Sequence, residues 1–194
     1  MVLDPPEPPH FAGRPLRKMS RTEYDKLVEL GYLTKEDKVE LVFGMVVAMS
    51  PIDNDHCESV ARIAKRLTIV LGDRASVRTQ LPLAASDDSE PEPDICIVPP
   101  TGWGKDHPAR AYLVVEVARS SLRYDRATKA HLYALSTVDE YWIVDHIHGV
   151  VEIYRDRDDG RWRTMTTHGR GETIAPRAFP DATIAVSEIV PPIA

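Results

Sequence analysis

The stretch "AYLVVEVARSS" (residues 111–121) reads as a strand with one charged residue, Glu116, in its middle. Six of the seven residues from Tyr112 to Ala118 are apolar, as expected for a strand that is covered on both faces. An ionised carboxylate is costly in such surroundings unless it is paired or bound to a metal. The stretch therefore predicts a central strand of a covered sheet, and it raises the question of what Glu116 faces.

A second short strand, "DICIV" (residues 94–98), opens on another carboxylate, Asp94. The 22 positions between Asp94 and Glu116 are about the length of strand, loop and strand, so neighbouring strands would bring the two side chains together. Two close carboxylates repel each other unless a proton or cation lies between them, and Mg²⁺ prefers oxygen ligands. The alternative is that Glu116 lies at a strand end and pairs with Arg119 or Arg123.

The rest of the chain predicts a mixed α/β domain. Capped amphipathic segments indicate helices that end near Gly31 and Gly72, and a further helix is expected to start near Asp125. A hairpin is expected around Gly44, and further strands over residues 75–84, 140–145, 150–155, 161–167 and 183–186. We expect a mixed central sheet flanked by helices, with added β-hairpins, over residues 19–194. A flexible proline-rich arm is expected over residues 1–18.

Composition narrows the class of protein. The chain has 194 residues, of which 43% are hydrophobic and 28% charged, as in a soluble globular protein. The net charge of −6 argues mildly against a non-specific nucleic-acid binder, which usually has a basic footprint. Without an 18-residue apolar run or a signal-peptide pattern, the sequence predicts a cytoplasmic protein with no membrane partner. The two cysteines are too few for a disulfide framework.

The joint pattern resembles one known family. The segments "PEPDICIV" and "YLVVEVARSSLRYDRATKAHLYALSTVDEYWIVD", with "VELVFGMVVAMSP" upstream and a histidine, His56, at the head of the long helix, closely resemble the Uma family of putative restriction endonucleases. This family belongs to the PD-(D/E)XK nuclease superfamily. The resemblance extends from about residue 22 to the end of the chain. It implies a restriction-endonuclease-like fold and phosphodiester hydrolysis that depends on Mg²⁺, for which Mn²⁺ can substitute.

The resemblance also assigns roles. Asp94 and Glu116 match the metal-binding acids, and the backbone carbonyl of Val117 would complete the inner ligand shell. The superfamily's lysine normally lies two residues after the second acid, where this chain has Ala118. Lys129, on the helix that follows, matches that lysine and would orient the attacking water and stabilise charge on the phosphate.

Each of four further positions has two possible roles, one in the site and one that is only structural. Glu40 matches an upstream acid that adds a ligand or holds a metal water, or it is a strand-end residue that reaches solvent. His56 is expected near the substrate phosphate, or makes a local hydrogen bond at the helix start. Gln80 contacts the site, or is a polar residue at a sheet edge. Asp125 caps its helix or orients Lys129, or forms an ordinary i,i+4 pair with it on a solvated face.

The sequence thus predicts a Mg²⁺-dependent endonuclease-like phosphodiesterase whose substrate is nucleic acid, with DNA preferred. One rival is a non-catalytic nucleic-acid-binding or assembly module that retains the scaffold, and another is an RNA or repair nuclease with the same site. Target specificity and oligomeric state are left open. A homo-oligomer is one alternative, since nucleases that cut both strands often pair.

Overall fold

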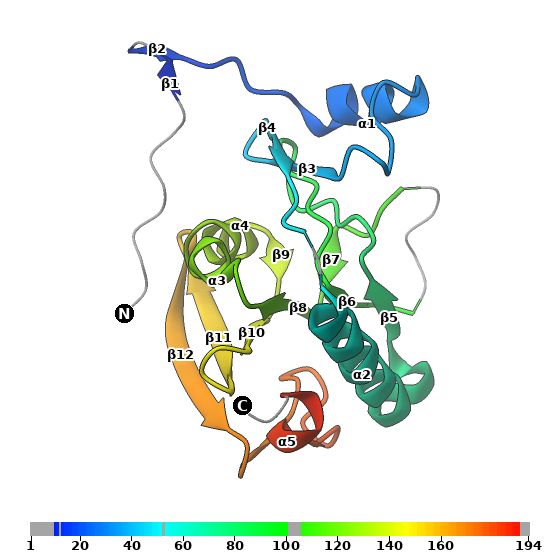
Figure 1. Cartoon of the computed structure of the whole chain (residues 1–194), viewed down its shortest axis with the longest axis vertical. Helices are drawn as coiled ribbons and strands as arrows, with labels where there is room; N and C mark the ends of the chain where they lie inside the picture. The colour runs from blue at the N-terminus through cyan, green and yellow to red at the C-terminus, as the bar shows by residue number, and fades with distance from the viewer. Residues whose placement is uncertain (1–9, 12, 52, 101–105, 191–194) are drawn as a thin grey trace.

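A six-stranded mixed sheet forms the centre of the molecule. The structure, a computed structural model, describes residues 10–11, 13–51, 53–100 and 106–190 (Figure 1). The sheet order is β12-β11-β10-β8-β6-β5, with β8 parallel to β10 and every other neighbouring pair antiparallel. Its strands are β5 (Ser76–Thr79), β6 (Ile95–Val98), β8 (Leu113–Ala118), β10 (Tyr141–Asp145), β11 (Val150–Asp158) and β12 (Arg161–Gly169).

Four two-stranded sheets accompany it. They pair β1 (His10–Phe11) with β2 (Arg14–Pro15), β3 (Val39–Val42) with β4 (Met45–Ala48), β7 (Arg110–Ala111) with β9 (Thr137–Val138), and β13 (Thr173–Ile174) with β14 (Ile184–Ala185). The β3–β4 hairpin turns at Gly44, which adopts a φ of 78°, as its position in the sequence predicts. Residues 1–9 and 12 of the expected arm lie outside the described residues.

Helices cover both faces of the sheet. The helices of the described residues are α1 (Arg21–Glu29), α2 (Asn54–Leu71), α3 (Leu122–Tyr124), α4 (Ala130–Leu135) and α5 (Val186–Ile189), with a 3₁₀ turn η1 (Gly72–Arg74) and a π-helical turn η2 (Asp125–Lys129). Helix α1 lies beyond the β3–β4 hairpin, away from the central sheet (Figure 1). In Figure 1, α2 lies on one side of β8 and the α3–α4 segment on the other. No helix in the described part of the chain combines the length and apolarity needed to cross a membrane.

The central strand β8 faces two separate cores because its side chains alternate. Val115 and Val117 pack with α2 and α5, whereas Val114 and Ala118 pack against α4. Glu116 shares the α4 face by this alternation. All six residues of β8 are buried, so the predicted central, doubly covered strand is confirmed.

Three sequence-based boundaries were wrong. The helix expected to start near Asp125 begins at Leu122, and its middle turn is π-helical. The strand expected over residues 75–84 ends at Thr79, because Gln80 adopts a positive φ of 49°. The strand expected around residues 183–186 is only Ile184–Ala185, and the chain then turns into α5.

Candidate functional site

Asp94 and Glu116 lie directly across from each other in the sheet. Strands β6 and β8 pair antiparallel with Ile95 opposite Val115, so one step further sets Asp94 opposite Glu116. The backbone N–H of Asp94 donates to Oε2 of Glu116 at 3.1 Å, and the N–H of Val117 donates to Oδ2 of Asp94 at 2.8 Å. These reciprocal bonds fix both carboxylates at one end of the strand pair.

The ammonium group of Lys129 lies between two of the acids. Its Nζ donates to Oε2 of Glu40 at 2.6 Å and lies 3.5 Å from Oε1 of Glu116. Burial lowers the pKa of Lys129, but the Glu40 and Glu116 carboxylates outweigh that effect and raise it above its ordinary value. Lys129 is therefore a permanent cation inside the site, and the interpretation of it as a solvated surface lysine is wrong.

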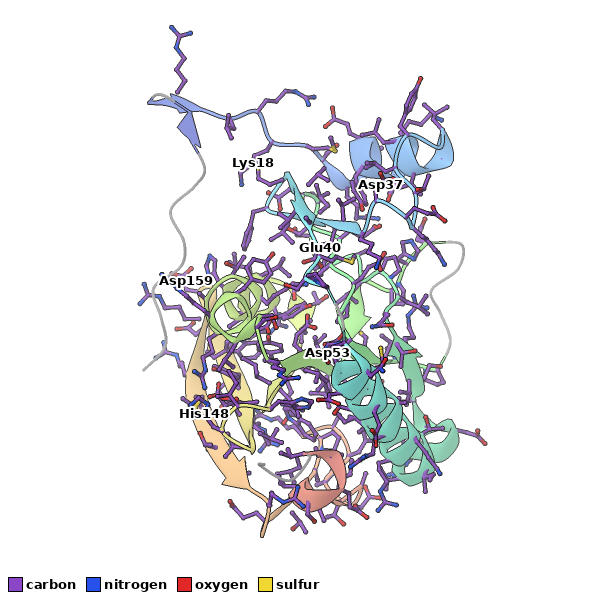
Figure 2. All side chains as sticks on the ribbon, viewed as in Figure 1. Lys18, Asp37, Glu40, Asp53, His148 and Asp159 are labelled. Carbon is purple, nitrogen blue, oxygen red and sulfur yellow. The ribbon has the colours of Figure 1, made fainter. Side chains whose placement is uncertain are left out.

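Glu40 reaches the site from a different part of the chain. It lies on β3 and is 5% exposed, so it does not extend into solvent. The backbone N–H of Glu92 also donates to Oε2 of Glu40, at 3.1 Å. Figure 2 shows Glu40 on the hairpin that borders the end of the sheet. The hairpin thus brings in a third carboxylate that the central strands do not carry.

Glu116 is held on its other side by a tyrosine. The hydroxyl of Tyr133, on α4, donates to Oε1 of Glu116 at 2.8 Å. Burial raises the pKa of Glu116 from 4.5 to about 8, the nearby Lys129 lowers it, and the Asp94 carboxylate raises it again. No ion pair joins Glu116 to an arginine among the described residues. Arg119 instead pairs with Asp53 and Asp55 on the surface.

His56 connects α2 to the site. Its Nε2 lies 2.8 Å from Oδ1 of Asp94. Its backbone N–H donates to Oδ1 of Asp53, the residue that caps the start of α2, at 2.9 Å. His56 thus makes the local bond at the helix start and also contacts Asp94, and its expected place near a substrate phosphate stays a prediction. The bond to Asp94 raises the pKa of His56, and the Val117 carbonyl raises it further. That carbonyl therefore faces the same end of the site.

Asp125 lies beside this cluster without pairing with Lys129. It does not cap the helix, which begins three residues earlier. Its carboxyl group is 4% exposed, and its Oδ2 has no hydrogen-bond partner within the described part of the chain. Burial raises the pKa of Asp125 from 3.8 to about 6. The neighbouring Tyr124 hydroxyl is likewise buried and unpartnered.

Gln80 supports the site only through its backbone. Its N–H donates to the carbonyls of Pro93 and Asp94, at 3.1 and 3.2 Å, and so holds the chain that enters β6. Its side chain is exposed beyond the edge strand β5. The interpretation as a polar residue at the sheet edge describes its side chain correctly.

The oxygen atoms of Asp94, Glu116 and Val117 are the candidate ligands for a divalent cation. Among the described residues, no three acidic, histidine or cysteine side chains are grouped closely enough to form a metal site by themselves. Mg²⁺, however, is usually bound through one or two carboxylates and keeps several waters. The facing carboxylates of Asp94 and Glu116, with the Val117 carbonyl nearby, fit that requirement. Burial raises the pKa of Glu116 and the Asp94 carboxylate adds to that effect, so a cation bound between the two acids would favour the ionised form.

Tyr133 contacts the site, whereas the sequence left open whether it lines the cleft or only packs, with packing favoured. It follows Lys129 by four positions, a spacing that places two residues on the same helix face. That spacing was the available signal. It indicates only a shared face, and packing was the simpler interpretation.

Comparison with known proteins gives a family and a fold. The profile of the Uma2 family, described as "Putative restriction endonuclease", matches residues 22–187. No curated protein matches the chain. The crystal structure of "a putative nuclease belonging to DUF820" from Anabaena variabilis ATCC 29413 matches with a TM-score of 0.69 at 12% identity, covering 84% of this chain and 96% of that one. The predicted nuclease-like α/β fold is confirmed.

Proposed function

Because the chain belongs to the Uma2 family of putative restriction endonucleases, we propose that it is a Mg²⁺-dependent endonuclease-like phosphodiesterase that acts on nucleic acid, with DNA preferred. The observation that carries the proposal is the reciprocal locking of Asp94 and Glu116 beside a buried lysine. Two fixed carboxylates can hold a cation at the phosphate, and a fixed ammonium can stabilise the charge that develops there.

In this proposal, Asp94, Glu116 and the Val117 carbonyl hold the cation, and Glu40 supports it or its water. When bound, Mg²⁺ would supply charge stabilisation at the phosphate and lower the pKa of a coordinated water. Lys129 orients the attacking water and offsets the charge that develops on the phosphate. Attack in line then leaves a 5′-phosphate.

His56 has a separate proposed role. It is the partly exposed member of the cluster, at 16% of its side chain, next to Asp94 at 14%, whereas Lys129 and Glu116 are more deeply buried. A substrate phosphate that approaches from solvent therefore meets His56 and Asp94 first. We assign His56 to contact with that phosphate.

Metal binding is the first test. Titration calorimetry of Mg²⁺ and Mn²⁺ into the wild type and Asp94→Ala should show binding to the wild type alone. Binding to neither protein removes the basis of the proposal. Equal binding to both proteins shows that the cation lies elsewhere.

Cleavage is the second test. Plasmid DNA, single-stranded DNA and structured RNA are incubated with Mn²⁺ and the wild type, Lys129→Ala or the surface control Lys26→Ala. We expect plasmid cleavage by the wild type and by the control, and a loss of about 10²-fold or more in Lys129→Ala. Undiminished cleavage by Lys129→Ala contradicts the role of that lysine.

The same experiment separates the rivals. Cleavage of RNA or of single strands without cleavage of intact duplex favours an RNA or repair nuclease. Retention of nucleic acid without any cleavage favours a non-catalytic module.

A further inference from the structure

The proposed reaction needs a group that takes the proton of the attacking water, and Lys129 cannot be that group. Its Nζ donates to Oε2 of Glu40 at 2.6 Å and lies 3.5 Å from Oε1 of Glu116. An ammonium held between two carboxylates has no lone pair to accept a proton. Lys129 can orient water and stabilise charge, but it cannot act as a base.

The two acids proposed as cation ligands are already engaged. Asp94 accepts hydrogen bonds through both of its oxygens, from His56 and from the Val117 N–H. Glu116 accepts the Tyr133 hydroxyl on one oxygen and the Asp94 N–H on the other. These two carboxylates are also the proposed cation ligands, and a carboxylate that holds a cation is a weak proton acceptor.

Asp125 is different, because one of its carboxylate oxygens is free to accept a proton. Its Oδ2 is buried and has no hydrogen-bond partner among the described residues, although the residue is only 4% exposed. A buried carboxylate oxygen without a partner is costly, and such atoms occur where a water, an ion or a reaction requires them. The Tyr124 hydroxyl, one residue earlier, is unpartnered in the same way.

The surroundings of Asp125 place it in the catalytic cluster. The charged groups that act on it come from three elements: Lys129 on its own helix, Glu40 on β3, and Asp94 at the start of β6. From β10, the Tyr141 hydroxyl donates to the Asp125 backbone carbonyl at 3.3 Å and does not occupy the carboxyl group. Burial raises the pKa of Asp125 and a hydrogen bond with Ser121 lowers it, while Oδ2 has no partner among the described residues.

We infer that Asp125 is the general base, the group whose Oδ2 accepts a proton from the attacking water. This inference rests on the proposed function. In the step, the water oxygen forms a bond to phosphorus while the bond from phosphorus to O3′ breaks. The electron pair of the broken bond stays on O3′, which takes a proton from solvent. The water's own proton moves to Asp125, which later returns it to solvent.

Asp125→Asn is the direct test, with Asp159→Asn as the matched control. Asp159 is an exposed carboxylate on the outside of the molecule (Figure 2). On a cleaved oligonucleotide with Mn²⁺, we expect kcat of Asp125→Asn to fall by about 10²- to 10⁴-fold. KM and Mn²⁺ affinity should stay at wild-type values, and Asp159→Asn should match the wild type throughout.

The pH profile tests a property that a structural residue would not change. In the wild type, log kcat should rise with pH up to about 6 and then level off, because only ionised Asp125 accepts the proton. Asp125→Asn should lose this limb. A wild-type profile without the limb overturns the inference, and this measurement needs no folded variant.

Two further measurements separate a base from other roles. A substrate with sulfur in place of O3′ has a leaving group that needs no proton, so Asp125→Asn should remain equally impaired on it. Recovery on that substrate would make Asp125 an acid and overturn the inference. Asp125→Ala should regain activity with added formate, and failure of formate to restore a folded Asp125→Ala counts against a base.

The inference and the proposed function fail in different ways. If the wild type cleaves nucleic acid and Asp125→Asn cleaves within about threefold of it, only the base assignment is wrong. If the loss in Asp125→Asn follows a loss of Mn²⁺ affinity, Asp125 is a ligand and not a base. If the wild type cleaves no substrate with either metal, the proposed function falls and the base assignment falls with it.

Discussion

Replacement of Lys129 by methionine removes one charge and keeps the length of the side chain. The ammonium lies 2.6 Å from Glu40 and 3.5 Å from Glu116, and all three residues are about 5% exposed. Lys129→Met therefore leaves buried carboxylates without their cation. Loss of one partner of a buried ion pair typically costs about 3–5 kcal/mol of unfolding free energy.

Protonation reduces that cost. Burial already raises the pKa of Glu116 to about 8, and Lys129 is the group that lowers it, so the variant raises this pKa further. The folded variant then binds more protons than the unfolded chain between the ordinary glutamate pKa and the raised one. Stability accordingly falls as pH rises through this window. The wild type shares this window only up to about pH 8, so we expect Lys129→Met to lose about 3 kcal/mol relative to the wild type at pH 8 and more as the pH rises further.

Urea unfolding, followed by the fluorescence of the buried Trp142 and Trp162, measures this loss. Lys26→Met is the matched control, because Lys26 is exposed and its pair with Glu29 should contribute less than about 1 kcal/mol. The double variant Lys129→Met/Glu40→Gln should be more stable than Lys129→Met alone. A loss below about 1 kcal/mol for Lys129→Met at pH 8, or no recovery in the double variant, would refute the reasoning.

Three further outcomes follow from single features. Because the pKa of Glu116 is about 8, Mn²⁺ affinity should rise about tenfold per pH unit up to that value, and calorimetry that shows no pH dependence contradicts this. Glu140→Gln should cost about 2 kcal/mol in urea unfolding, because buried Glu140 accepts from Trp142 and Arg155. Gly44→Ala should lower the free energy of unfolding by about 1–2 kcal/mol, because the φ of Gly44 is 78° and a Cβ would lie 2.5 Å from that of Lys18. Unchanged stability of Glu140→Gln or of Gly44→Ala would contradict the prediction for that variant.

The predicted parts of the fold are those that local sequence determines. Helix α1 begins after Ser20, which forms a capping box with Glu23, and α2 ends at Gly72. The facing of Asp94 and Glu116 also followed from sequence, because Asp94 opens one apolar strand, Glu116 interrupts the next, and the two strands are short. These signals lie within a few residues of the features that they predict.

The unpredicted parts depend on distant contacts. Glu40 meets Lys129 across 89 positions, and the pattern around Glu40 alone was equally compatible with a solvent-facing strand end. The helix that carries Lys129 starts at Leu122 and contains the π-helical turn η2, and the sequence has no strong local signal for either feature. The bond from Tyr133 to Glu116 requires knowledge of which sheet face α4 covers.

The π-helical turn η2 explains why Asp125 and Lys129 do not pair. In an α-helix, residues four apart lie one above the other and an Asp–Lys pair is expected. Asp125 and Lys129 instead lie in the π-helical turn η2, whose i→i+5 hydrogen bonds replace the α-helical register between them. The described residues accordingly show no ion pair between them, and Lys129 meets Glu40 and Glu116 instead.

Buried side chains support that turn from outside the helix. The Tyr141 hydroxyl donates to the carbonyl of Asp125, and Nε1 of Trp162 donates to the carbonyl of Ala130 at 2.8 Å. These bonds satisfy carbonyls that an irregular turn leaves less well paired, and both donors come from the central sheet. Lys129 can thus reach the carboxylates from the helix that follows β8, because the sheet supports the turn from which Lys129 points inward.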